Sequence, residues 1–305
     1  MSAEALVVVL GPTAVGKSRV AVDLALRFGG EVVSGDSIQV YRGFDIGADK
    51  PSPEARRGVP HHLIDIVGPE VQFTAADFVR EALAAARDIA GRGRLPVVAG
   101  GTGLYLKALL DGLFPGPGRD PAVRAALEAE AREKGLGALF RRLEAVDPDY
   151  ARKVRDRDRV RIVRALEVHA ATGRPISEHF RSTASPVGGR TVVRLGLRLE
   201  REELRRRIEA RVEGMFARGF VDEVRGLLER GVPDSAPAFR ALGYGHVLRH
   251  LRGEIGRDEA AELTKADTRR YAKRQMTWFR KMDGVAWFSP DDRAGLEEHV
   301  RNGLQ

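Results

Sequence analysis

The sequence predicts an α/β fold in which a parallel sheet is flanked by helices and carries an all-helical insertion domain. Short apolar runs such as Leu6–Leu10 and Leu95–Ala99 alternate with segments of helical spacing, as expected for right-handed crossovers between parallel strands. Directly after the first run, Gly11–Ser18 fits the pattern G-x-x-x-x-G-K-[ST], with a helical segment behind it. The fold is therefore expected to be like that of the P-loop NTPases.

The glycine-rich loop predicts a site for a phosphate chain. Gly11 and Gly16 let the backbone curl so that its N–H groups point inward, and the helix that follows adds its positive end. Lys17 is then expected to neutralise a terminal phosphate, and the Ser18 hydroxyl to bind Mg²⁺. A glycine-rich turn without a ligand is the alternative, and the strand and helix on either side argue against it. Such loops are typical of nucleotide binding, including ATP binding, but the motif does not identify the compound that carries the phosphates.

The first part of the core domain, expected over residues 1–115, holds further strands and a helix. Glu31–Ser34 predicts a strand that places Asp36 at its carboxyl end, where open α/β sheets bind ligands. A charged, glycine-rich loop, a short strand and a helix are then expected over 42–60, His61–Ile66 and 75–90. The run Leu95–Ala99 is another buried strand, and it ends in a second glycine-rich turn, Gly100-Gly-Thr-Gly.

An all-helical insertion domain is expected over residues 116–190. No strand pattern occurs there, and Asp120-Pro121 and Asp147-Pro148 are typical helix starts. A third helix is expected over 157–171, ended by Thr172-Gly173-Arg174-Pro175.

The second part of the core domain is expected over residues 191–305. The run Thr191–Leu197 predicts a strand that rejoins the sheet. Helices are expected at about 200–218, 220–230, 243–252 and 257–281, and a last strand at Val285–Phe288.

Composition excludes several classes of protein. The 305 residues contain no cysteine, so disulfides and thiolate metal sites are absent. No run of about 18 apolar residues occurs, which predicts no membrane span. The first strand follows Met1 so closely that no signal peptide is expected, and we expect a cytoplasmic monomer. The net charge of +8 favours a polyanionic partner.

Two features decide between kinds of phosphate chemistry. Asp36 can hold Mg²⁺ through water or act as a base, and the alternative is a helix N-cap for Ser37–Tyr41. A motor ATPase should have an acidic residue at the end of the strand beside the P-loop, but Leu95–Ala99 leads into Gly-Gly-Thr. Group transfer from a phosphate-bearing donor therefore fits better than ATP hydrolysis.

Two basic stretches point to RNA. Arg157, Arg161 and Arg164 share a helix face. Arg269–Lys281 interleaves cations with aromatic residues, and such residues bind phosphates and stack on unpaired bases. A solvated cationic helix with Trp278 and Phe279 in the core is the alternative. Arg207 and Arg211 lie one turn apart beside an apolar stripe. Either arginine could reach a diphosphate, and an exposed helix face is the alternative.

Taken together, these segments resemble the tRNA dimethylallyltransferase family, also called tRNA isopentenyltransferases. The resemblance rests on segments that occur in the family's order along nearly the whole chain: Gly11–Ser18, Asp36–Tyr41, Asp45–Pro51, Pro60–Asp65, Gly100–Tyr105, Arg164–Glu167, Gly243-Tyr244 and Lys273–Trp278. It implies transfer of a dimethylallyl group from dimethylallyl diphosphate to N6 of adenosine 37 in tRNA, beside the anticodon.

The resemblance also assigns roles to residues. It implies that Asp36 is the general base, that Thr102 contacts the target adenosine, and that Mg²⁺ is bound at Ser18. The donor site is implied to consist of Gly11, Pro12, Thr13, Ala14, Val15, Gly16, Lys17, Ser18 and Arg211. The tRNA anticodon stem-loop is implied to contact Asp36, Ser37, Ile38, Gln39, Thr102, Arg124, Val160, Arg161, Ile162, Val163, Arg164, Arg240, Ala241, Leu242, Gly243, Tyr244, Gly245, Lys273, Arg274, Gln275, Met276, Thr277, Trp278, Phe279 and Arg280.

Two other classes of function remain open at this point. A nucleotide-dependent small-molecule kinase also pairs a P-loop with an aspartate, but it would need no basic, aromatic C-terminal helix. A non-catalytic RNA-binding NTPase would keep its RNA affinity when Asp36 is lost.

Overall fold

The computed structural model describes residues 5–114, 116–118 and 120–305. The chain divides into two compact units. One contains the residues up to Leu110 and those from Val187 onward, and the other is Asp111–Pro186, compared with the expected insertion at 116–190. No helix within the described ranges is long and apolar enough to cross a membrane.

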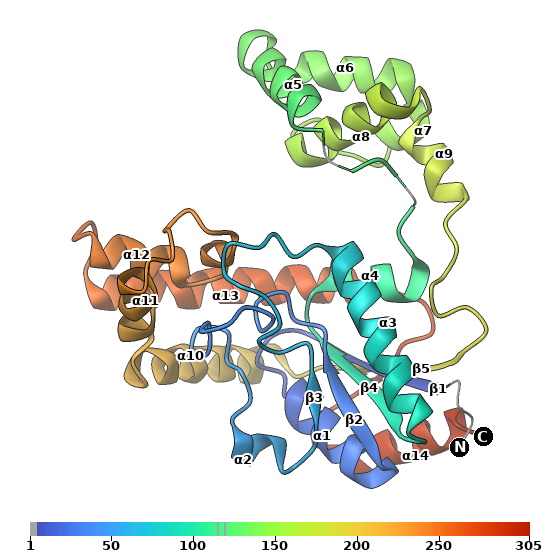
Figure 1. The fold of residues 1–305 in the computed structure, drawn as a ribbon, viewed down its shortest axis with the longest axis vertical. Helices are drawn as coiled ribbons and strands as arrows, with labels where there is room; N and C mark the ends of the chain where they lie inside the picture. Colours follow the sequence, from blue (N-terminus) through green and yellow to red (C-terminus); the bar gives the residue numbers. More distant parts are fainter. Residues whose placement is uncertain (1–4, 115, 119) are drawn as a thin grey trace. The chain divides into compact units, whose positions relative to one another are not determined.

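The first unit is built on a parallel sheet (Figure 1), as predicted. Within the described residues its strands lie in the order β3-β2-β4-β1-β5-β6. They are β1 (Ala5–Leu10), β2 (Gly30–Ser34), β3 (His61–His62), β4 (Leu95–Gly100), β5 (Thr191–Leu197) and β6 (Ala286–Phe288). The strand expected over His61–Ile66 is wrong beyond His62, because Leu63 and Asp65 adopt φ angles of +63° and +59° and cannot continue an extended chain.

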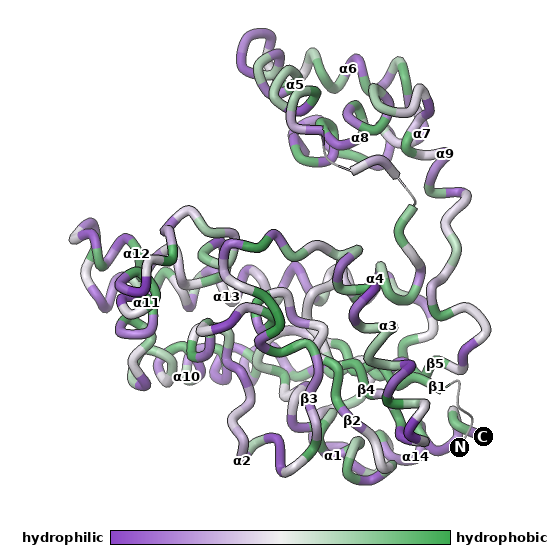
Figure 2. The backbone as a smooth tube through the Cα atoms, viewed as in Figure 1, coloured by the Kyte–Doolittle hydropathy of each residue, from purple (hydrophilic) through white to green (hydrophobic). Residues whose placement is uncertain are grey.

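Both faces of the sheet are covered, which explains why its central strands β1 and β4 are apolar along their whole length (Figure 2). In β1, Val7 and Val9 pack into one core cluster, together with residues of α1 (Lys17–Phe28) and α14 (Arg293–Gly303). Leu6, Val8 and Leu10 belong to the opposite cluster with α3 (Ala75–Gly91) and α4 (Gly103–Asp111). This alternation follows from the two-residue period of a strand.

The remaining helices of this unit pack in the same cluster as α3 and α4. They are α10 (Arg201–Ala217), α11 (Phe220–Glu229), the short 3₁₀ helix η1 (Pro237–Arg240), α12 (Tyr244–Leu251) and α13 (Arg257–Phe279). The expected helices and the last strand are confirmed to within two or three residues. The helices α14 and α2 (Pro53–Arg56) were not predicted.

The second unit is all-helical in its described residues, as predicted. It consists of α5 (Pro121–Lys134), α6 (Leu136–Val146), α7 (Pro148–Ala151), α8 (Arg159–Thr172) and α9 (Ile176–Arg181). Asp120 and Asp147 accept hydrogen bonds from the first-turn N–H groups of α5 and α7, which confirms both as helix starts. The helices α6 and α9 were not predicted.

A buried carboxylate ties this unit together. Glu167 is fully buried and accepts hydrogen bonds from the Asp120 backbone N–H at 2.9 Å and from Arg164 Nη1 at 2.9 Å. Arg124 Nη1 lies 3.7 Å from the same carboxylate. Arg164 also donates to the Pro117 carbonyl at 2.8 Å. Two of the arginines that the resemblance assigns to tRNA, Arg124 and Arg164, therefore already neutralise an internal charge.

The separation of β2 and β4 depends on a glycine. The Gly35 N–H donates to the Ala99 carbonyl at 2.8 Å, which continues the pairing of these strands into the following turn. A Cβ at Gly100 would lie 2.4 Å from the Gly35 carbonyl oxygen. A larger residue must push the two strand ends apart.

We therefore predict that Gly100→Ala destabilises the protein by about 1–3 kcal/mol, the usual cost of overpacking. Gly91→Ala is the matched control, because a Cβ there meets nothing within 4 Å and alanine favours the helix. Urea unfolding should show a lower midpoint for Gly100→Ala and an equal or higher one for Gly91→Ala. Equal midpoints for Gly100→Ala and the unmodified protein would contradict this account of the strand ends.

Candidate functional site

A polar pocket opens where three neighbouring strands end. In the sheet, Leu10 of β1 is level with Gly100 of β4, and Ala99 of β4 is level with Ser34 of β2. The turns after these strands therefore converge. The pocket is lined by Thr13, Lys17, Ser18, Ser34, Asp36, Gln39, Ala48, Asp49, Ala99, Gly100, Gly101, Arg211, Tyr271 and Gln275.

The loop between β1 and α1 has the backbone that an anion site requires. Gly16 has φ +102°, and a Cβ at Gly11 would lie 2.8 Å from the Leu197 carbonyl oxygen, so both positions need glycine. Lys17 Nζ donates to the Pro12 carbonyl at 2.7 Å. The predicted donor residue Val15 is fully buried, so its side chain anchors the loop in the core instead of facing a ligand.

The ammonium group of Lys17 is held in an unfavourable environment. Burial and, to a smaller extent, the nearby Arg211 guanidinium lower its pKa from 10.5 to about 7, although the charge of Asp36 partly offsets both effects. A bound anion would restore the charged form. The pocket is therefore poised to take up a proton when it binds phosphate groups.

Arg211 reaches the P-loop from α10, far away in the sequence. Its Nη1 donates to Thr13 Oγ1 at 2.5 Å, and its Nε lies 3.2 Å from Asp49 Oδ2. The predicted donor-site arginine is thus brought to the loop. Asp49 was missed, because nothing in its local sequence indicates an arginine on a distant helix.

A carboxylate binds the backbone of the segment that carries Asp49. Glu223 on α11 accepts hydrogen bonds from the backbone N–H groups of Asp45, Ile46 and Gly47 at 2.9, 2.5 and 3.2 Å. It also accepts one from the Tyr244 hydroxyl at 2.8 Å. Tyr244 is fully buried, so its side chain supports this segment and presents no surface to RNA.

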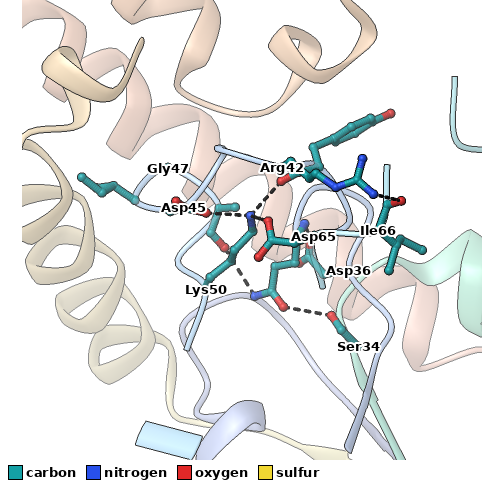
Figure 3. A network of polar contacts seen from close by, with 12 residues as sticks. Ser34, Asp36, Arg42, Asp45, Gly47, Lys50, Asp65 and Ile66 are labelled. Carbon is teal, nitrogen blue, oxygen red and sulfur yellow. Dashed lines mark hydrogen bonds and ion pairs between the residues drawn. The ribbon is translucent and has the colours of Figure 1, made fainter. Parts of the chain in front are cut away.

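A lysine ammonium group also holds this segment in place (Figure 3). Lys50 Nζ donates to Asp45 Oδ1 at 2.7 Å, Asp65 Oδ1 at 2.5 Å and the Tyr41 carbonyl at 2.7 Å. The Gln39 side-chain oxygen accepts a hydrogen bond from the Ser34 hydroxyl at 2.9 Å. Lys50 and Glu223 together fix the position of Asp49 against Arg211.

Asp36 lies on the turn after β2. Its Oδ1 accepts hydrogen bonds from the Ile38 and Gln39 N–H groups at 2.8 and 3.4 Å. No helix forms over the following residues, so the alternative of a helix N-cap is wrong and the carboxylate caps a turn. Thr102 Oγ1 accepts from the Ser37 N–H at 3.1 Å and so joins this turn to the one after β4.

Two residues of α13 complete the wall of the pocket. Gln275 Oε1 accepts from the Thr13 N–H at 2.9 Å, and its Nε2 donates to the Gly101 carbonyl at 2.7 Å. Gln275 is 5% exposed and its amide already has two partners inside the protein, while its expected contact with tRNA stays a prediction. Burial and the charge of Asp36 raise the pKa of Tyr271 to about 12, which keeps the hydroxyl protonated as a donor.

The remaining residues expected to bind tRNA differ in how far their side chains are buried. The side chains of Ile162, Val163 and Phe279 are fully buried, so they pack in the cores and present no surface to RNA. The exposed ones are Val160, Arg161, Arg240, Gly245, Lys273, Arg274, Thr277 and Arg280. Those of intermediate exposure are Ser37, Ile38, Gln39, Thr102, Arg124, Arg164, Ala241, Leu242, Met276 and Trp278, while Gly243 is buried.

The donor set suits Mg²⁺ shared with a ligand. In the described part of the chain, no three acidic or histidine side chains cluster as a protein cage for a metal. Mg²⁺ commonly takes only one or two protein ligands and completes its shell with phosphate oxygens and water. The exposed Ser18 hydroxyl lines the pocket that also holds Asp36 and Asp49.

Comparisons with known proteins agree along the whole chain. The family model "IPP transferase" matches residues 39–282, and the model "Isopentenyl transferase" matches residues 4–65. The tRNA dimethylallyltransferase of Geobacter sulfurreducens is 52% identical over 92% of this chain and 91% of its own length. That of Thermomicrobium roseum is 48% identical over 98% of this chain and 92% of its own.

Solved structures agree with the sequence relatives. The tRNA isopentenylpyrophosphate transferase of Bacillus halodurans superposes with a TM-score of 0.73 at 40% identity, covering 99% of this chain and 97% of that one. A eukaryotic dimethylallyltransferase acting on tRNA superposes with a TM-score of 0.80 at 28% identity, covering 99% and 77%.

We predict that a diphosphate monoester binds more weakly as the pH rises from 7.5 to 9. Free Lys17, with its pKa of about 7, is mostly neutral in this range, and the anion selects the protonated form. Binding must therefore take up a proton, and affinity should fall up to about tenfold per pH unit until the pKa of the bound state is reached. Calorimetry at pH 8.5 in two buffers of different ionisation enthalpy should detect nearly one proton taken up.

The control is Lys17→Arg, because a guanidinium stays protonated throughout this range. Its affinity should change little between pH 7.5 and 9, whatever its absolute value. A pH-independent affinity of the unmodified protein would show that Lys17 is already charged when the pocket is empty.

Proposed function

This chain belongs to the tRNA dimethylallyltransferase family, a family of prenyltransferases, and from that membership we propose that it transfers the dimethylallyl group of dimethylallyl diphosphate to N6 of adenosine 37 in tRNA. The single observation that carries the proposal is that a P-loop and a carboxylate, Asp36, line one pocket. One can hold the leaving diphosphate and the other can accept the proton of the attacking amine.

The diphosphate of the donor is proposed to lie along the loop from Gly11 to Ser18. Lys17 and Arg211 line this pocket, and the Ser18 hydroxyl would hold Mg²⁺ there. When bound, Mg²⁺ would neutralise charge that develops on the departing diphosphate. Lys17 and Arg211 do the same from fixed positions, so they stabilise the transition state more than the ground state.

The acceptor is an amine whose lone pair is delocalised into the adenine ring. As the bond from N6 to the first carbon of the dimethylallyl group forms, the bond from that carbon to the diphosphate oxygen breaks. The N6 proton passes to the Asp36 carboxylate, which the Ile38 N–H orients at 2.8 Å. Thr102 is proposed to contact the target adenosine beside Asp36, because its hydroxyl accepts a hydrogen bond from Ser37 on the turn that carries Asp36. The adenine must leave its stack to enter the pocket, and a single-stranded anticodon loop makes this inexpensive.

The proposal is tested by incubating the protein with labelled dimethylallyl diphosphate and unmodified tRNA in Mg²⁺ without ATP. Label should appear in tRNA, and digestion should place it on N6 of adenosine 37. A strict requirement for ATP, with one ATP hydrolysed for each group transferred, would overturn the proposal in favour of an NTP-dependent mechanism. ATP turnover with no label in tRNA would favour a small-molecule kinase.

The role of Asp36 predicts a large and specific loss in Asp36→Asn. The amide keeps an oxygen that can accept the Ile38 N–H, so the turn should persist, but it cannot take the N6 proton. Single-turnover transfer should fall by about 10²–10⁴, while the dissociation constants of both substrates stay within a few-fold. A wild-type rate would assign the proton to water or another carboxylate. Partial recovery with added Mg²⁺ would assign Asp36 to the metal.

The exposed cations of α13 predict the salt dependence of tRNA binding. Lys273→Glu with Arg274→Glu should weaken binding and flatten the plot of log affinity against log salt by about one for each lost phosphate contact. Donor affinity should hardly change. The control is Lys265→Gln on the same helix, since Lys265 already pairs with Glu213 and Glu262. An unchanged salt slope in the double variant would make this helix face structural.

A further inference from the structure

The side chain of Gln275 joins two turns that lie far apart in the sequence. Thr13 is 262 residues away from it and Gly101 is 174 residues away, yet both form hydrogen bonds with its amide, at 2.9 and 2.7 Å. Its neighbours Lys273, Arg274 and Thr277 on α13 are exposed. One face of the helix is thus turned to solvent, while Gln275 reaches the loops that follow β1 and β4.

Each turn connects onward to a group that the proposed reaction uses. The Thr13 hydroxyl accepts a hydrogen bond from the Arg211 guanidinium at 2.5 Å, in the part of the pocket where the donor diphosphate is proposed to lie. Gly101 precedes Thr102, whose hydroxyl accepts the Ser37 N–H at 3.1 Å next to Asp36. The amide of Gln275 therefore bridges the donor loop and the turn after β4, which Thr102 in turn joins to the turn that holds Asp36.

The chemistry of the bridge is specific to a glutamine. One end must accept from a backbone N–H and the other must donate to a carbonyl, which neither a carboxylate nor an apolar chain can do. Space is tight as well, because a Cβ at Gly101 would lie 2.5 Å from Gln275 Nε2. Losing the amide would leave a nearly buried N–H and C=O without their partner.

We infer that Gln275 is a positioning residue, which sets the distance between the donor diphosphate and Asp36. The inference rests on the proposed function, and it assigns Gln275 a task inside the protein that is distinct from RNA contact. Transfer requires the reacting atoms to approach within about 3–3.5 Å, and a displacement of about 1 Å can cost about 10²-fold in rate. A change at Gln275 should therefore reduce the chemical step and leave tRNA affinity nearly intact.

The test compares Gln275→Met, Gln275→Glu and the unmodified protein in single-turnover transfer with both substrates saturating. Methionine keeps the length without the amide, and we expect the rate to fall about 10- to 100-fold, with the dissociation constant for tRNA within about threefold. Glutamate can still accept the Thr13 N–H but repels the Gly101 carbonyl, so it should also be slow. Glu262→Gln, an exposed change on α13, is the control and should keep the full rate.

Two further measurements separate positioning from simple loss of structure. Gly101→Ala keeps the Gln275 amide but displaces it. This variant should therefore also lose transfer rate while its tRNA affinity stays nearly unchanged. In a double-mutant cycle of Gln275→Met and Thr102→Val, the losses of transfer rate should be less than additive in free energy, because both residues act on the turn after β4. Additive losses, or a loss that follows the fall in melting temperature across all variants, would make Gln275 merely structural.

Two more outcomes would overturn the inference. A normal rate with tRNA affinity reduced more than tenfold would make Gln275 an RNA contact, and an unchanged rate with unchanged affinity would leave the bridge without a role. Transfer by the unmodified protein is measured first. If it transfers no label, the proposed function itself fails; if it does and the Gln275 variants match it, only the present inference fails.

Discussion

The site depends on the parallel pairing of β2, β4 and β1 with their carboxyl ends nearly level. Because parallel strands all run in the same direction, the turns that follow them gather at one edge of the sheet. The P-loop, Asp36 and Gly101-Thr102 are those turns. Even the spacing of β2 from β4 is set locally, since the Gly35 carbonyl oxygen occupies the place where Gly100 would carry a side chain.

The C-terminal half of the chain supplies what these turns lack. Arg211, Glu223 and Gln275 come from three different helices, and each contacts a loop that follows or lies beside the first strands. Lys17 and Arg211 share the pocket with Asp36 and Asp49, so charges of both signs are in place before any ligand arrives. A site whose dipoles and charges are already oriented needs little reorganisation during the reaction.

Burial separates two kinds of residue within each basic segment. In α13, Lys273 and Arg274 face solvent while Gln275 and Phe279 point inward. In the helical insertion, Arg161 is exposed, whereas Arg164 pairs with the buried Glu167. A cation with a buried partner is less available to a phosphate, since leaving that partner uncompensated costs about 3–5 kcal/mol. The surface that remains free for RNA is therefore smaller than the positive charge of either segment indicates.

The sequence by itself determined the fold class, most of the helices and strands, and the three turns of the site. These features follow from local patterns: apolar runs buried on both faces, helix caps, and glycines at positions where a side chain would collide. The strand expected over His61–Ile66 was too long, because the positive φ angles of Leu63 and Asp65 cannot be recognised from the local sequence. Only the tertiary structure decided how Asp49 and Gln275 are used. Their partners lie more than a hundred residues away, and a hydrogen bond or ion pair across such a distance depends on how helices pack, which no short window of sequence records.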